Sequence, residues 1–172
     1  MKQQDIITKE FTELYASESD AIFRYCYFRI NDREQAKDII QEAFMRVWDN
    51  MSKGTDIKNL RAFLFKITTN LIIDWYRKKK AVSLDSLMET DEGEQRLQLT
   101  DESFEQIEIQ LEGKRLIERL QTLDSTYQLV VYLRFVEELS PKEIAEIVNL
   151  SVNVVSVRIN RGIEMLKKKY EK

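Results

Sequence analysis

The most informative stretch of the chain is residues 139–169, where helix-start signals and a short break frame two amphipathic segments. Ser140 and Pro141, the only proline in the chain, are typical of a helix N-terminus, and Glu143 completes a capping box. The break at 149–151 separates this helix from a second one. Two helices joined by a three-residue turn predict a helix-turn-helix, whose second helix would enter the major groove of DNA. The alternative is an ordinary helical hairpin whose charges are only solvated.

The second of these helices divides into an apolar stripe and a polar remainder. Helical spacing predicts a buried stripe of Val152, Val155, Ile159, Ile163 and Leu166. The side chains off this stripe are of the types that contact base edges and phosphates. These candidate DNA-binding residues are Asn153, Ser156, Arg158, Asn160 and Arg161. We expect Asn153 and Ser156, nearer the N-terminus of the helix, to read sequence, and Arg161 to bind mainly phosphate.

The net charge of −3 is unevenly distributed along the chain. Residues 81–106 are strongly acidic and lack sustained periodicity, whereas the flanking parts are each slightly basic. Aperiodic acidic segments are typical of linkers and of disordered chain. Apolar periodicity predicts two further helices, at 107–122 and 125–136, before the helix-turn-helix. The predicted fold class is therefore all-α, with small helical domains at 1–80 and 107–172 joined by a flexible acidic linker.

Composition narrows the classes of function. Glycines number only 4 and charged residues make up 33% of the chain, which favours helices over a β-sandwich. No apolar run reaches membrane-spanning length and no signal peptide opens the chain, so we expect no membrane insertion. Histidine is absent and Cys26 is the only cysteine, which indicates a cytoplasmic location and leaves little material for a zinc site or a catalytic relay. We therefore expect no cofactor and no enzymatic activity.

The N-terminal domain begins with two expected helical regions. Residues 6–30 carry an aromatic-rich face that suits one or two helices, and Asp32 is a plausible cap for the next helix. Residues 33–50 combine a core stripe with a polar face that holds Asp38, Gln41, Glu42 and Arg46. The carboxylates of Asp38 and Glu42 are neighbours because they lie four residues apart. Such a pair is more often a solvated or partner-facing patch than a metal site.

A third helical region at 61–80 places cations beside aromatic rings. Its expected buried side is Phe63, Leu64, Ile67, Leu71 and Trp75, and a polar loop at 49–60 precedes it. Cations next to aromatics suit melted nucleic acid, where bases stack on rings and cations follow phosphates. The candidate residues are Lys53, Lys66, Asn70, Trp75, Tyr76, Arg77, Lys78 and Lys79. The alternative is a core helix whose basic end complements its dipole.

Three segments resemble, in one order, the short ECF-type (extracytoplasmic function) bacterial RNA polymerase sigma factors of the sigma-70 family. The family's core-polymerase-binding helix is similar to residues 38–48, DIIQEAFMRVW. Its −10-recognition helix is similar to residues 61–79, RAFLFKITTNLIIDWYRKK. Its whole region-four domain is similar to residues 118–162. The resemblance covers nearly the entire chain, and three matches in order are more specific than any one.

The resemblance implies a factor that binds core RNA polymerase and directs promoter recognition, promoter melting and transcription initiation. The clamp helices of the β′ subunit would face Asp38, Gln41, Glu42 and Arg46. A pocket for a flipped −10 base would come from the loop at 49–60 and Asn70, and upstream phosphates would be held by Arg77, Lys78 and Lys79. The −35 element would be bound by Asn153, Ser156, Arg158 and Arg161.

Further partners follow from the same resemblance. The C-terminal domain would meet the β flap of polymerase, in addition to promoter DNA. The acidic linker would pass through polymerase channels that otherwise accept RNA. Many members of the family are held by an anti-sigma factor, so the resemblance adds such an inhibitor to the expected partners.

Two other readings start from the same residues. A stand-alone helix-turn-helix regulator would bind duplex DNA as a dimer without polymerase, but it leaves the motifs at 38–48 and 61–80 unexplained. A metal-dependent nuclease would use Asp38, Glu42 and Asp74, but the chain has no histidine and no Gly-rich phosphate loop.

Overall fold

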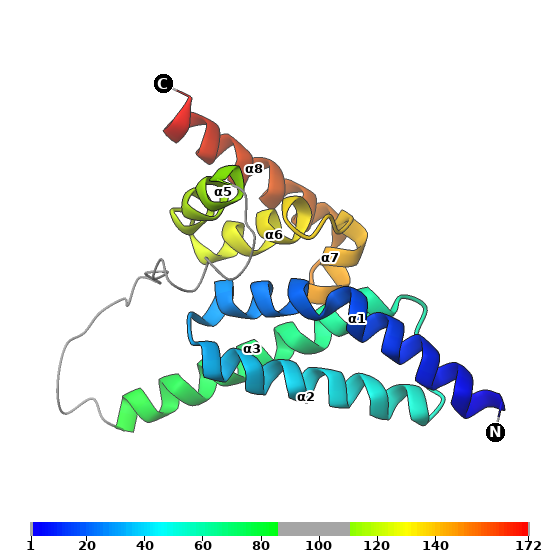
Figure 1. Ribbon diagram of the computed structural model, residues 1–172. Coiled ribbons are helices and arrows are strands. Elements are labelled where there is room, and N and C mark those ends of the chain that lie inside the picture. The colour runs from blue at the N-terminus through cyan, green and yellow to red at the C-terminus, as the bar shows by residue number, and fades with distance from the viewer. Residues whose placement is uncertain (1, 86–110, 172) are drawn as a thin grey trace. The chain divides into compact units, whose positions relative to one another are not determined.

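The computed structural model describes residues 2–85 and 111–171. The chain divides into two compact units, and the described part of each is built from helices (Figure 1). No strand occurs within the described residues, and the all-α fold class is confirmed. The expected linker lies outside the described residues from position 86 on. The helices in the two described ranges include none that is long and apolar enough to cross a membrane.

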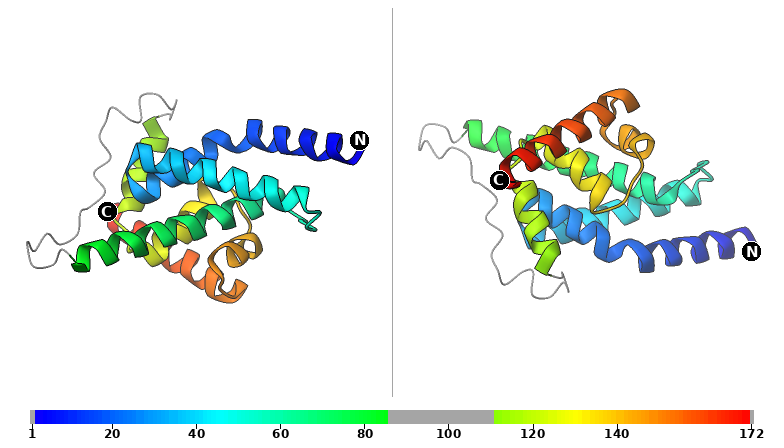
Figure 2. Two further views of the ribbon diagram at one scale, coloured as in Figure 1. Left: turned by 90° about the horizontal axis from the view of Figure 1, so that it is seen from below. Right: turned by 90° about the horizontal axis from the view of Figure 1, so that it is seen from above.

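Three helices form the first unit: α1 (Lys2–Ile30), α2 (Arg33–Ser52) and α3 (Leu60–Asp85). Each packs against the other two, and Figure 2 shows them side by side. The region expected as one or two helices is thus the single helix α1. The loop expected at 49–60 is shorter, because α2 continues to Ser52. Helix α3 also extends to Asp85, past residue 80 where we expected it to end.

The turn between α1 and α2 depends on two short polar residues. Asn31 has a φ of 49°, a left-handed conformation that asparagine tolerates better than most residues. Asp32 caps α2 as predicted, since its side chain accepts a hydrogen bond from the backbone N–H of Gln35 at 3.1 Å. The cap fixes where α2 begins, and the buried stripe from Ala36 to Met51 is the face that packs on the other helices.

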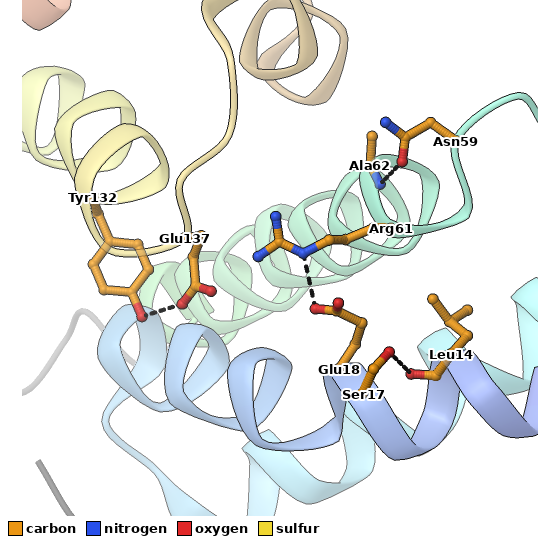
Figure 3. A network of polar contacts seen from close by, with 8 residues as sticks. All are labelled: Leu14, Ser17, Glu18, Asn59, Arg61, Ala62, Tyr132 and Glu137. Carbon is orange, nitrogen blue, oxygen red and sulfur yellow. Dashed lines mark hydrogen bonds and ion pairs between the residues drawn. The ribbon is translucent and has the colours of Figure 1, made fainter.

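Polar contacts also fix the start of α3 (Figure 3). The backbone N–H of Ala62 donates to Asn59 Oδ1 at 3.0 Å, so Asn59 satisfies one of the free donors at the helix start. Arg61 Nε donates to Glu18 Oε2 at 3.0 Å, an ion pair that joins α3 to α1. These contacts orient the helix that carries most of the candidate −10 residues.

The buried stripe of α3 differs from the predicted one. Leu64 is buried as expected, but the other expected positions, Phe63, Ile67, Leu71 and Trp75, are only half-buried. The fully buried positions instead include Phe65, Thr68, Thr69 and Ile72. The two threonines enter the core because each hydroxyl donates at 2.7 Å to the carbonyl four residues earlier. Hydropathy spacing misses them because it counts threonine as polar.

The second unit consists of α5 (Leu111–Gln121), α6 (Ser125–Phe135), α7 (Pro141–Val148) and α8 (Val152–Tyr170). Helix α6 contacts the other three, and α8 packs along α6 and α7. The segment between α6 and α7 is held by the Tyr132 hydroxyl, which donates to Glu137 Oε1 at 3.0 Å (Figure 3). Arg134 Nη1 also donates to the Leu139 carbonyl at 3.2 Å.

The predicted helix-turn-helix is confirmed in its details. Ser140 Oγ accepts from the Glu143 N–H at 3.2 Å, and Glu143 Oε2 accepts from the Ser140 N–H at 2.7 Å, which is the capping box. Asn149 ends α7 with a left-handed φ of 56°. Ser151 then caps α8, because its Oγ accepts from the Val154 N–H at 3.2 Å.

The buried stripe of α8 is partly as predicted. Val155 and Ile159 are buried, and Ile163 and Leu166 are half-buried. The prediction for Val152 is wrong, since its side chain is 46% exposed. Helical spacing places a residue on a stripe but does not tell how far along the stripe the neighbouring helices reach.

Candidate partner and nucleic-acid interfaces

An apolar groove of about 1030 Å³ lies between α1 and α2. Much of its lining is aromatic: Phe11, Tyr15, Phe23, Phe44 and Trp48. The rings pack on one another, with 5.1 Å between the centroids of Phe11 and Trp48 and 4.8 Å between those of Tyr15 and Phe44. Such contacts between aromatic rings stabilise the packing of α1 on α2.

Three of the four predicted polymerase-binding residues lie in this groove. Gln41, Glu42 and Arg46 line it, whereas Asp38 is exposed but is not part of the lining. Arg46 Nε donates to Glu42 Oε1 at 2.8 Å, and both side chains remain about half exposed. An apolar wall with a charged rim is the usual composition of a protein–protein interface.

Two large exposed side chains of the groove were not among the residues predicted from the sequence to bind polymerase. Met45 is 60% exposed and Tyr15 is 53% exposed. Tyr15 was counted with the aromatic face of its helix, and Met45 lies off the core stripe of α2 and was not considered. The available signal was a large apolar residue outside the stripe, which becomes informative only when the structure shows a groove beside it.

The three carboxylates that a metal-dependent nuclease would use do not form a metal site. Within residues 2–85 and 111–171, no group of three or more His, Cys, Asp or Glu side chains could hold a metal ion. Glu42 instead pairs with Arg46, and Asp74 Oδ1 lies 3.9 Å from Arg77 Nη1.

The candidate −10 residues on α3 fall on two faces of the helix. Lys66, Asn70 and Arg77 are exposed, and their spacing of four and seven residues aligns them on one face. On another face, Lys79 Nζ lies 4.8 Å from the centroid of the Trp75 ring, a cation–π contact. The Tyr76 ring meets Trp75 edge-on at 5.0 Å. Lys78 is exposed as well.

Tyr76 is anchored to the unit by its hydroxyl, which donates to the carbonyl oxygen of Arg29 near the end of α1. Burial raises the pKa of Tyr76, and the positive charge of Arg29 partly opposes that rise. The phenol therefore stays protonated at neutral pH and remains the donor in this hydrogen bond. The ring is still 38% exposed and so keeps a surface for contact.

Lys53 is separated from the other candidate −10 residues. It follows the end of α2, and its Nζ pairs with Asp49 Oδ2 at 2.6 Å. The loop that contains it leads into the start of α3, and about 25 Å of helix separates Leu60 from Arg77. The structure therefore does not gather Lys53 with the basic end of α3.

The candidate −35 residues occupy the outward part of α8 to different degrees. Asn153, Asn160 and Arg161 are exposed, whereas Ser156 and Arg158 are half-buried at its sides. The prediction did not include Val154 and Val157, which are each 39% exposed. The sequence could have indicated them, because both are apolar residues that lie off the predicted core stripe of α8.

Comparison with known protein families gives two matches in chain order. The model for Sigma-70 region 2 matches residues 14–82, which contain the second half of α1, all of α2 and most of α3. The model for Sigma-70, region 4 matches residues 113–166, which contain the helix-turn-helix. The two matches correspond to the two units of the chain.

Similar proteins and structures agree with these matches. The ECF RNA polymerase sigma factor SigW of Bacillus subtilis (strain 168) is 34% identical over 163 residues, which cover 92% of this chain and 87% of SigW. The RNA polymerase sigma factor YlaC of the same organism is 29% identical, with 100% of this chain and 96% of YlaC covered.

Two solved structures share the fold. The sigma factor RpoE of Bartonella quintana, in complex with the anti-sigma factor NepR, has a TM-score of 0.72 at 19% identity and covers 95% of this chain and 99% of that one. CnrH, in complex with the cytosolic domain of CnrY, has a TM-score of 0.65 at 22% identity, with 95% and 89% covered. The 34% identity with SigW and the two region matches show that the chain belongs to the ECF family of RNA polymerase sigma factors, which bind core RNA polymerase and direct transcription initiation at promoters.

Proposed function

We propose that the protein acts as a sigma factor through three binding surfaces. The groove between α1 and α2 binds the clamp helices of the polymerase β′ subunit. The exposed faces of α3 hold melted −10 DNA, and the outward side of α8 binds the −35 element. The protein supplies binding free energy without catalysing a reaction, and it acts in the cytoplasm, where polymerase and promoters meet.

The observation that carries the proposal is the groove between α1 and α2. Its aromatic wall and the rim of Gln41, Glu42 and Arg46 suit a helical protein partner, which would bury apolar residues and pair its charges around them. All the residues that line the groove, except Phe11, lie in the segment that matches Sigma-70 region 2. A regulator acting on duplex DNA alone would not need a polymerase-binding surface.

The two faces of α3 suit the two parts of melted DNA. Lys66, Asn70 and Arg77 form an exposed polar face that can follow the phosphates of one strand. The rings of Trp75 and Tyr76 offer stacking surfaces beside cations, and Lys78 and Lys79 extend the basic end toward upstream duplex. We assign the loop that contains Lys53 to the pocket for a flipped −10 base, as the family resemblance implies.

The helix-turn-helix suits major-groove binding. Asn153, Asn160 and Arg161 are exposed and can reach base edges or phosphates, and Asn153 lies in the first turn, where such helices contact bases. The half-burial of Ser156 and Arg158 favours contacts at the walls of the groove, where the phosphates lie. Contact of this unit with the β flap, and control by an anti-sigma factor, complete the proposal and rest on the family alone.

A transcription and pull-down experiment tests the assignment of the groove. Asp38→Lys with Glu42→Lys should weaken binding to core polymerase and leave the fold intact, because neither side chain is in the core and the opposite charge would repel a partner fitted to the original one. The matched control is Asp5→Lys with Glu118→Lys, two exposed acidic positions outside the groove with the same change in net charge.

Run-off transcription with core polymerase and a gel shift supply the readouts. The wild-type protein should bind promoter DNA tightly only with core enzyme. Unchanged pull-down of the Asp38/Glu42 variant would remove the groove from the proposal. Equally tight binding of duplex without polymerase would favour the stand-alone regulator.

A further inference from the structure

Three exposed valines lie near the start of α8, the helix that binds DNA in the proposed function. Val152, Val154 and Val157 are 46%, 39% and 39% exposed. β-branched residues are weaker helix formers than the polar residues that usually cover a solvated helix face. A single exposed apolar residue needs no explanation, so the arrangement of the three decides whether they have a role.

Val157 stands at the centre of the outward face of α8. Successive residues turn by about 100° around a helix, which places Val157 roughly opposite the buried Val155. On a helix surface the neighbours of a residue lie three and four positions away. For Val157 these neighbours are Asn153, Val154, Asn160 and Arg161. Val154 and Val157 therefore form one apolar patch bordered by three hydrogen-bonding side chains.

The third valine lies on a different side of the helix. Val152 is five positions before Val157, which turns it away by about 140°. It is no less exposed than the other two, but its neighbour four positions on is Ser156 at the side of the helix, and neither Asn160 nor Arg161 lies three or four positions from it. The chain thus offers an internal comparison between exposed valines inside and outside the proposed reading face.

We propose that Val157, supported by Val154, contacts the C5-methyl group of thymine in the −35 element and so contributes to promoter specificity. The inference rests on the proposed role of α8. In the major groove only thymine presents a methyl group, and apolar side chains recognise it by excluding water from it. Adenine is read by asparagine, and Asn153 and Asn160 border the patch, so the face favours A·T base pairs. Val157 takes the central place among the base contacts, and Ser156 lies at the side.

Replacement of thymine by deoxyuridine tests this contact, because it removes the methyl group and leaves base pairing intact. Holoenzyme is assembled from core polymerase and the full chain, and its preferred −35 sequence is selected from a randomised library. Each thymine of that element is then replaced singly by deoxyuridine. Initiation by the wild type should fall about fourfold at one or two positions, the loss expected when one buried methyl group is removed.

Two variants separate this contact from a general effect on the helix. Val157→Ala should transcribe thymine and deoxyuridine templates equally, whereas Val152→Ala should keep the wild-type preference. Pull-down with core polymerase should be unchanged for both, since neither valine is in the core of the unit.

The outcomes distinguish the inference from the proposal on which it rests. Suppose that the library yields core-dependent transcription with a preferred −35 sequence. The sigma role then stands, but the inference is wrong if replacement of the thymines in that sequence has no effect. It is also wrong if Val152→Ala abolishes the preference for thymine over deoxyuridine as Val157→Ala does. A preferred element without thymine would also overturn it. If no −35 sequence is preferred at all, the proposed role of α8 fails first.

Discussion

Gly162 of α8 lies so close to Val131 of α6 that a Cβ atom on Gly162 would stand 2.6 Å from Val131 Cγ2. The same Cβ would lie 3.4 Å from the Cβ of Tyr127. Glycine at this position therefore allows α6 and α8 to cross closely, and it fixes how α8 packs within its unit. Because Gly162 and Val131 are both buried, no solvent gap can absorb a larger residue.

Gly162→Ala should lower the stability of the second unit. Overpacking costs typically about 1–3 kcal/mol, which exceeds the gain of at most about 1 kcal/mol from replacing glycine in a helix. The free energy of unfolding, measured by urea denaturation, should fall, while the exposed control Glu164→Ala should change it little. Addition of Val131→Ala should recover part of the loss in a double-mutant cycle, and strict additivity would contradict the proposed clash.

Met45→Asp should weaken binding to core polymerase about tenfold or more without unfolding the protein. The Met45 side chain is 60% exposed in the groove, so the fold loses little, whereas a carboxylate in an apolar interface is poorly solvated. Met165→Asp is the matched control, since Met165 is 43% exposed on α8 and lies outside the groove. Titration of each variant with labelled core enzyme measures the effect, and equal losses for both would contradict the assignment.

Cys26 should resist alkylation in the folded protein. Its side chain is fully buried, and burial raises the pKa of the Cys26 thiol well above its ordinary range. Iodoacetamide at pH 8 should therefore modify the thiol only after guanidinium chloride is added. Rapid modification of the native protein would contradict this environment.

The same shift predicts the direction of a pH effect on stability. The folded state keeps the thiol protonated, while the unfolded thiol ionises near its ordinary pKa of about 8.5. The free energy of unfolding should therefore decrease as pH rises through that value. Below that pH the thiol is protonated in both states, and its full contribution to stability is present. Cys26→Ala should lack this component of the pH dependence, which a comparison of urea melts from pH 7 to 10 can resolve.

The helix-turn-helix could be predicted in detail because its signals are local. The capping box of Ser140 and Glu143 and the cap by Ser151 involve residues within three positions of each other. Such contacts depend on backbone geometry that the segment itself determines. The turn at 149–151 was therefore predicted together with both helix starts.

The groove and the core of α3 could not be predicted with the same accuracy because they depend on contacts between distant segments. The Tyr25 hydroxyl lies 2.7 Å from Thr69 Oγ1 inside the first unit, and spacing along α3 gives no sign that a threonine there would be buried. Likewise, Phe11 and Trp48 form one wall although they belong to different helices. The polar residues of α2 were identified, but the hollow beside them needed the packing of α1.

The hydroxyl and the ring of Tyr76 should have separable roles. The hydroxyl donates to the Arg29 carbonyl, so Tyr76→Phe should cost about 1 kcal/mol of stability, the usual contribution of one hydrogen bond. The exposed ring remains in that variant, and melting of the −10 region should proceed as in the wild type at temperatures where the protein is folded. Tyr76→Ala should lose the ring as well, and loss of a stacking partner for a base costs roughly 1–3 kcal/mol. Permanganate reactivity of −10 thymines in the holoenzyme–promoter complex reports melting, and urea denaturation of the free protein reports stability. If Tyr76→Phe reduces permanganate reactivity as strongly as Tyr76→Ala while the protein stays folded, the hydroxyl acts on DNA, and its bond to Arg29 is not its role in the complex.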